Sequence, residues 1–342
     1  MGLPADKTLR LDPKDDYTHP VEEAMNYNES MYFNVFDHNQ RLGGWFRIGN
    51  RPNEKYAEVT CCIYLPDGRV AFMFKRPEIS HNDDMNAGGL SIEIVEPMKK
   101  QRIIYSGSLC LLDNPYEMSD PRKAFKNNPH VKAEICIDFQ GCSPVDGGEV
   151  VNKDGSPIEQ SLNSMGRAHY EQNQKGSGTI QVGDDSYVIS GIGLRDHSWG
   201  PRYWQAVYWY RWLTMSFSED FAITAAIVSN TPDKRRVACM IQKGDRYISV
   251  KECTIETQYN DDYYQESMKI WIKDEEGEEY NVDAKVLSLI PLRNRRETPE
   301  GEKLLTRITE AMTEYRCNGM VGYGMSEYLD QIVDDLPVGR EC

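Results

Sequence analysis

Apolar and polar residues alternate with a period of two along most of the chain, a pattern typical of β-strands rather than helices. In residues 56–76, Cys61, Ile63 and Leu65 alternate with their neighbours. A Pro-Asp-Gly turn follows, and the alternation then resumes, which predicts a β-hairpin. Similar strand patterns occur in residues 102–112, 131–140, 178–192, 203–216, 221–229, 236–240, 247–259, 266–272 and 282–290.

Helical patterns are few. Ser119 and Asp120 followed by Pro121 predict a short helix that runs to Phe125. Many short strands at spacings of roughly ten residues predict an all-β fold of antiparallel barrels or sandwiches. A glycine-rich stretch around residues 146–157 divides the 342-residue chain nearly in half. We therefore expect two β domains, residues 1–155 and 156–342.

Composition and charge narrow the range of partners. The formal net charge of −15 disfavours nucleic acid and anionic membrane surfaces. The longest apolar stretch, residues 221–228, is much shorter than the roughly 20 residues that span a bilayer, and no signal-peptide pattern opens the chain. The nine cysteines are irregularly spaced without C-x-x-C, which argues against a zinc site or disulfide framework. We expect a cytoplasmic protein with no nucleic-acid partner and no membrane span.

The segment with the densest candidate chemistry is residues 191–202, where Asp196, His197 and Trp199 lie between glycines. In an extended chain Asp196 points away from Arg195 and His197. Desolvation among apolar groups would then raise the pKa of Asp196 and make it a general acid. Alternatively, Asp196 caps a turn or pairs with Arg202.

Aromatic residues crowd the next segment. If the strand alternation starts at Trp204, Tyr208, Tyr210 and Trp212 share one face. These rings, with Trp199, are candidate substrate-binding residues, because aromatic faces stabilise a cation. Plain core packing is the alternative.

Two further groups are candidates. His169 and Glu171 share a strand face and are candidate catalytic residues lining a cavity, although solvent exposure would explain them too. Glu327, in a glycine-containing strand near the C-terminus, is a candidate inward-facing carboxylate for substrate binding; the alternative is a closing strand without chemistry. The sequence has no P-loop, G-x-G-x-x-G, H-E-x-x-H or G-x-S-x-G motif, and we expect no cofactor and no metal.

The string Asp196-His197-Ser198-Trp199-Gly200 resembles the D-H-x-W-G signature of the AttH-like and carotenoid 1,2-hydratase superfamily. Residues 28–33 and 43–47 look like the first domain of one branch of that superfamily, and residues 169–172 and 322–324 look like its second domain. The resemblance implies two packed lipocalin-like β-barrels that bind a hydrophobic small molecule in or between them.

In the hydratases of that superfamily, the aspartate of the motif is thought to protonate an isolated C=C bond. Carried over, that role falls on Asp196. The strand alternation makes Trp199, Trp204 and Tyr208 the candidates for stabilising the cation. We therefore expect an enzyme that hydrates, cyclises or isomerises an isoprenoid-, steroid- or polyketide-like substrate. Fungal Diels–Alderases are known to share the fold, so a cofactor-free pericyclase is an alternative, as is a non-catalytic carrier of a hydrophobic ligand.

Overall fold

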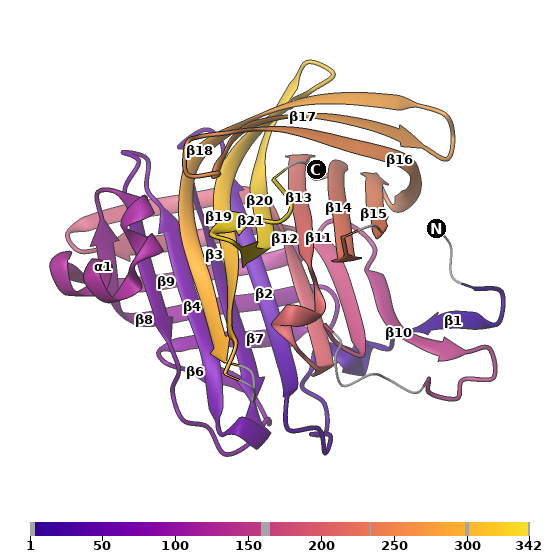
Figure 1. The fold of residues 1–342 in the computed structure, drawn as a ribbon, viewed down its shortest axis with the longest axis horizontal. Helices are drawn as coiled ribbons and strands as arrows, with labels where there is room; N and C mark the ends of the chain where they lie inside the picture. The colour runs from indigo at the N-terminus through magenta and orange to yellow at the C-terminus, as the bar shows by residue number, and fades with distance from the viewer. Residues whose placement is uncertain (1–3, 159–164, 233, 298–300, 341–342) are drawn as a thin grey trace.

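The computed structural model describes residues 4–158, 165–232, 234–297 and 301–340. It has the predicted all-β architecture, with two antiparallel sheets packed together (Figure 1). The first sheet contains β1 (Lys7–Arg10), β2 (Tyr27–Asp37), β3 (Leu42–Arg51), β4 (Tyr56–Tyr64), β5 (Val70–Lys75), β6 (Met85–Ala87), β7 (Leu90–Glu96), β8 (Lys100–Leu112), β9 (His130–Gly141), β10 (Asp146–Asn152), β11 (Ala168–Val182) and β12 (Asp185–Pro201).

The second sheet follows in the chain, and short helical turns connect some of the strands. The sheet contains β13 (Trp209–Ser218), β14 (Phe221–Thr231), β15 (Lys234–Lys243), β16 (Arg246–Tyr259), β17 (Gln265–Asp274), β18 (Glu279–Glu297), β19 (Lys303–Cys317), β20 (Met320–Val333) and β21 (Leu336–Pro337). The helical turns are η1 (Pro13–Asp16), η2 (Pro52–Glu54), η3 (Pro115–Ser119), η4 (Trp204–Ala206) and the α-helix α1 (Pro121–Asn127). As predicted, α1 begins at a proline. No helix in the described ranges is long and apolar enough to cross a membrane.

Each sheet closes on itself. In the first, β9 pairs with both β8 and β11, so that β2, β3, β4, β5, β8, β9, β11 and β12 form a ring. In the second, β13 pairs with β20 and closes the ring of β13 to β20. Closure removes the exposed strand edges that would otherwise pair with other chains.

The change from one sheet to the other falls between Pro201 and Trp209, not at the expected boundary between residues 155 and 156. The glycine-rich stretch lies around β10, which pairs within the first sheet with β1 and β11. The first ring needs β11 and β12 for its closure, and these strands carry His169, Glu171 and Asp196. The D-H-x-W-G motif therefore belongs to the first barrel.

Three apolar clusters form the interiors of the two barrels and the contact between them. One fills the first barrel and includes Phe33 and Phe46, and another fills the second. The third lies between the barrels, where Trp45 of the first barrel and Met325 of the second belong to the same buried cluster. Period-two alternation gives the strands at this contact two buried faces, so one strand serves two cores.

Candidate active site between the barrels

Strand β12 presents chemically different side chains on its two faces. Asp196 lies near His169 and Arg202, on the face toward the second barrel. Arg195 and His197 contact Asp16 and Glu29 on the opposite face. The extended backbone predicted from the sequence therefore separates Asp196 from the adjacent arginine.

Asp196 belongs to a row of cross-strand neighbours on the outer face of the first barrel. Glu171 of β11 lies opposite Asp196, Tyr32 of β2 is its partner on the other side, and Arg47 of β3 lies beyond. His169, on the same face, places its Nε2 atom 3.1 Å from Glu171 Oε1. Half of the His169 side-chain surface (51%) and part of Asp196 remain accessible. Solvent therefore reaches both residues.

The second barrel completes the cluster. Trp212 donates its indole N–H to Glu171 Oε1 at 3.0 Å, and its ring meets that of Tyr32 edge-on at a centroid distance of 5.6 Å. Tyr210, two residues earlier on β13, donates its hydroxyl hydrogen bond to Glu327 of β20. The predicted catalytic residues of one barrel thus meet the aromatic residues of the other.

Two carboxyl groups of the second barrel face each other. Glu327 lies directly opposite Glu310 of β19, and both are buried. Burial raises the pKa of Glu327 to about 7, and burial together with the charge of Glu327 raises the pKa of Glu310 well above its ordinary value. Because two adjacent buried carboxylates repel each other, the pair retains a proton at neutral pH.

Asp196 has no hydrogen bond or ion pair among the described residues that would fix its charged form. Burial raises its pKa above 3.8, and the charge of Glu171 acts in the same direction. His169, Arg202 and Arg47 lower the pKa, but burial outweighs them. The result is an accessible carboxyl group with a raised pKa, as a general acid requires.

The expected alternative, an ion pair between Asp196 and Arg202, does not form within the described chain. Arg202 instead donates to Ser198 Oγ at 2.5 Å. Its guanidinium group and that of Arg47 lie over the ring of Trp204, at 5.4 and 5.7 Å from the centroid. Burial and the charge of Arg47 lower the pKa of Arg202 to about 10.

The structure therefore brings most of the predicted site residues to one place, but not Trp199 and Tyr208. Trp199 faces the first barrel, where it stacks on His19 at a centroid distance of 3.9 Å. Tyr208 packs against the core of the second barrel. The turn η4 interrupts the strand at Trp204, so the alternation counted from that residue does not continue. Tyr32, Arg47 and Glu310 could not be predicted as site residues from the sequence, because their neighbours come from distant strands and no local motif marks them.

A cavity of about 650 Å³ lies farther along the boundary between the two barrels. Its lining includes Lys175 and Ile192 of the first barrel and Phe217 and Tyr323 of the second. Ile192 lies four residues before Asp196 on β12, which corresponds to roughly 13 Å along an extended strand. The candidate catalytic residues are not part of this lining.

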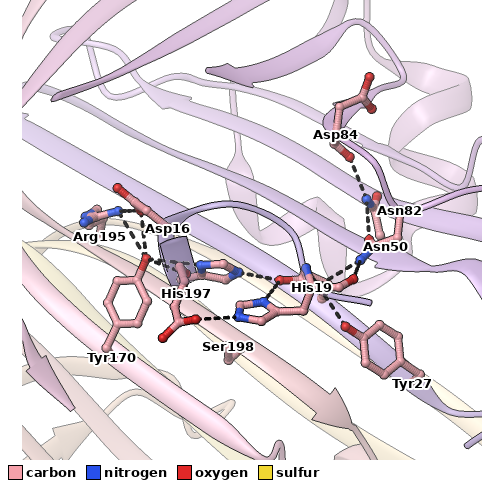
Figure 2. A network of polar contacts seen from close by, with 12 residues as sticks. Asp16, His19, Tyr27, Asn50, Asn82, Asp84, Tyr170, Arg195, His197 and Ser198 are labelled. Carbon is pink, nitrogen blue, oxygen red and sulfur yellow. Dashed lines mark hydrogen bonds and ion pairs between the residues drawn. The ribbon is translucent and has the colours of Figure 1, made fainter. Parts of the chain in front are cut away.

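A dense polar network occupies the opposite face of β12 (Figure 2). Glu29 of β2 accepts hydrogen bonds through Oε1 from His19 Nδ1 at 2.7 Å and from His197 Nε2 at 2.8 Å. Its Oε2 accepts from Tyr27 and Asn82, each at 2.8 Å, and from the backbone N–H of His19 at 2.9 Å. Every lone pair of this carboxylate is used.

The carboxylates of this network are held in the charged state. Burial opposes ionisation of Glu29, but its two histidine partners lower its pKa far below the ordinary value. Burial likewise opposes ionisation of Asp16, and the ion pair with Arg195 lowers its pKa. Among the described residues, His19, Glu29 and His197 form a group whose donor atoms all lie within 4.8 Å of one another, a spacing that a metal ion can bridge.

A family model described as a domain of unknown function (DUF7064) matches residues 12–332. The chain belongs to this family. A search of the curated proteins found no match.

Solved structures share the fold over almost the whole chain. Kievitone hydratase from Nectria haematococca has a TM-score of 0.53 and 11% identity, with 90% of each chain covered. A putative AttH from Nitrosomonas europaea has a TM-score of 0.55 and 10% identity, with 96% of this chain and 98% of that chain covered. CghA with Sch210972 has a TM-score of 0.51 and 10% identity, with 98% of both chains covered. The fold is thus that of the AttH-like proteins, as the motif indicated.

Proposed function

We propose that this member of the family is a cofactor-independent enzyme that transfers a proton between Asp196 and a carbon atom of a hydrophobic small molecule. The substrate binds between the two barrels, where Asp196 is accessible. Isoprenoid-, steroid- or polyketide-like molecules fit this chemistry, because each offers apolar surface and C=C bonds. The proposed reactions are hydration, cyclisation or isomerisation.

The observation that carries the proposal is the protonation tendency of Asp196. Its carboxyl group lacks a hydrogen-bonding partner among the described residues and has a raised pKa, although two arginines lie nearby. A carboxylate whose role was structural would be paired, as Glu29 is on the other side of the sheet. The unpaired acid therefore favours a chemical role.

The first step would transfer the Asp196 proton to one alkene carbon, forming a C–H bond and a cation at the other carbon. The Asp196 carboxylate and the ring faces of Tyr32 and Trp212 would stabilise that cation. Addition of water followed by loss of one of its protons completes hydration. Loss of a neighbouring C–H proton gives isomerisation. Attack by a second C=C bond closes a ring and forms a new cation, which then loses a neighbouring C–H proton to complete cyclisation. In each case a released proton restores the Asp196 acid.

His169 and Glu171 would act as positioning residues in this scheme. The hydrogen bond that His169 donates to Glu171 and the charge of Asp196 outweigh burial and raise the pKa of His169. The imidazole N–H would donate to Glu171 Oε1 and so orient that carboxylate beside Asp196. The shared fold with an enzyme named as a hydratase is consistent with this class of reaction.

The test begins with native mass spectrometry of freshly purified protein, followed by extraction and identification of the bound molecule. That molecule is then incubated with the enzyme in deuterated water. We expect deuterium at carbon with the wild type and none with Asp196→Asn, while the variant still binds the molecule. Asp184→Asn, in the turn between β11 and β12, is the matched control.

Each alternative gives its own result. A pericyclase would convert its substrate with Asp196→Asn nearly as fast as with the wild type, and would incorporate no deuterium. A carrier would return the bound molecule unchanged. Either result would overturn the proposed proton transfer.

A further inference from the structure

We propose that His19, Glu29 and His197 form a binding site for one divalent metal ion, with Zn²⁺ the favoured ion, inside the end of the first barrel. Two imidazole nitrogens and one carboxylate oxygen converge there, and these are the donor types that zinc prefers. This site lies on the face of β12 opposite Asp196. It is independent of the proposed proton transfer.

The hydrogen-bond directions around His197 support the proposal. Tyr170 donates its hydroxyl hydrogen to Asp16 Oδ1 at 2.8 Å, and Asp16 is paired with Arg195. The Tyr170 oxygen is therefore the acceptor for His197 Nδ1–H at 3.1 Å. In a neutral imidazole the other nitrogen, Nε2, then carries a lone pair. This nitrogen faces Glu29 Oε1 at 2.8 Å, and a metal ion there would replace the proton that otherwise joins the two atoms.

The charge count is compatible with a dication. Glu29 and Asp15 each bring a negative charge to His19, with Asp15 Oδ1 3.5 Å from His19 Nε2. Arg195 is used by Asp16 and does not balance them. One Zn²⁺ held by two neutral histidines would balance both carboxylates.

The surroundings fix the donors as the outer shell of a metal site does. Tyr170 orients His197 from behind, and Trp199 stacks on the ring of His19 with an interplanar angle of 15°. Asn82 and Tyr27 hold the second oxygen of Glu29, which leaves Oε1 directed at the two imidazoles. Figure 2 shows His19, His197, Tyr170 and Asn82 gathered around this point.

Only modest movement would be needed. Zinc bonds of about 2 Å in tetrahedral geometry place neighbouring donor atoms roughly 3.3 Å apart. The two nitrogens lie 2.7 and 2.8 Å from Oε1, so each would move about half an ångström away from that oxygen, and all three donor atoms already lie within 4.8 Å of one another. Three protein donors leave one coordination position for water. The sequence alone does not indicate this metal site, because its three donors come from separate segments of the chain.

The experiment uses the full chain, expressed without a histidine tag and stripped with a chelator. It is titrated separately with Zn²⁺ and Co²⁺, and the metal retained after gel filtration is counted. We expect one equivalent of either metal and a visible Co²⁺ d–d absorption. We also expect a metal-dependent rise in the melting temperature. His19→Asn should abolish stoichiometric binding, and Tyr170→Phe should weaken it by about 10- to 100-fold.

His81→Asn is the matched control, because His81 is exposed beside Asp83. It should bind like the wild type, and Cys136→Ser, which removes an exposed thiol, should do the same. If His19→Asn fails to fold, the wild-type titration still decides the matter. No stoichiometric uptake by the wild type, or unchanged uptake by a folded His19→Asn variant, would overturn the site and leave a network held by protons.

Discussion

The two faces of strand β12 show how burial acts on a carboxyl group with and without partners. On the inner face, Glu29 and Asp16 are completely surrounded by donors, and their pKa values are lowered. The outer face carries Asp196, whose pKa is raised, and it is turned toward the second barrel, where burial raises the pKa values of Glu310 and Glu327 as well. Charged, paired carboxylates thus lie on one side of strand β12, and protonatable ones lie on the other. Removing one partner of a buried pair destabilises the fold, whereas an unpaired group is available for chemistry.

The largest expected effect comes from removing the acid on the outer face. Asp196→Asn should lower turnover of the molecule recovered from the protein by about 10²- to 10⁴-fold, the usual contribution of a positioned general acid. Stability should not fall, since the carboxyl group has no hydrogen bond to lose among the described residues. Turnover is measured by product formation and folding by near-UV circular dichroism. Turnover within a few-fold of the wild type would remove Asp196 from the mechanism.

The matching substitution on the inner face should affect stability instead. Glu29→Gln leaves two histidines without their anionic partner and should cost about 3–5 kcal/mol in the free energy of unfolding at pH 7. The pKa of Glu29 is lowered on folding, so its contribution is present above its unfolded value of 4.5 and is lost as the pH falls below it.

Urea denaturation of Glu29→Gln at pH 7 and pH 4 measures this, with Glu93→Gln at an exposed strand position as the control. We expect the difference from the wild type to shrink at pH 4. A small cost, equal at the two pH values, would mean that the network does not hold Glu29 in its charged state.

The opposite sign is expected for Glu327. Its pKa rises on folding from 4.5 to about 7, so its contribution is fully present below pH 4.5 and is lost as the pH rises through 7. Glu327→Gln should therefore gain about 1–3 kcal/mol relative to the wild type between pH 5 and pH 8, since one pKa unit corresponds to about 1.4 kcal/mol. Denaturant unfolding at both pH values measures the change. A relative stability that does not vary with pH would contradict the raised pKa.

The smallest effect concerns Trp204, whose ring lies under two guanidinium groups. Trp204→Leu should lower the free energy of unfolding by about 1–2 kcal/mol, because each cation–π contact is worth about 0.5–1 kcal/mol at a partly exposed site. Trp271→Leu, on a strand away from the site, is the control for loss of an indole. Equal losses in the two variants would show that the arginines do not depend on Trp204.

The local part of the structure could be predicted from the sequence. Alternation predicted the hairpin of β4 and β5. It also predicted that Asp196 points to the other face of its strand from Arg195 and His197, because successive side chains of a strand point to alternate faces. The alternation predicted from Trp204 onward is wrong at its start, because the turn η4 interrupts the strand before Trp209.

The remaining features depend on pairings between strands far apart in the chain. The first barrel closes through β9 with β11 and β12 with β2, which no local pattern reveals, so the sequence suggested a domain boundary where the sheet continues. For the same reason Glu310 and Arg47 were not recognised beside Asp196, nor His19 and Glu29 beside His197. For both the candidate active site and the proposed metal site, the only local signal is the closely spaced charged residues of the D-H-x-W-G motif.

The measurement that tests this account most directly is a ¹³C NMR titration of the protein labelled at its side-chain carboxyl carbons. The Asp196 signal is assigned by its loss in Asp196→Asn, and the Glu29 signal by its loss in Glu29→Gln. We predict that Asp196 titrates above the ordinary aspartate value of 3.8 and that Glu29 stays ionised below 4.5. An Asp196 carboxyl group that titrates at or below 3.8 would contradict the assignment of Asp196 as the acid.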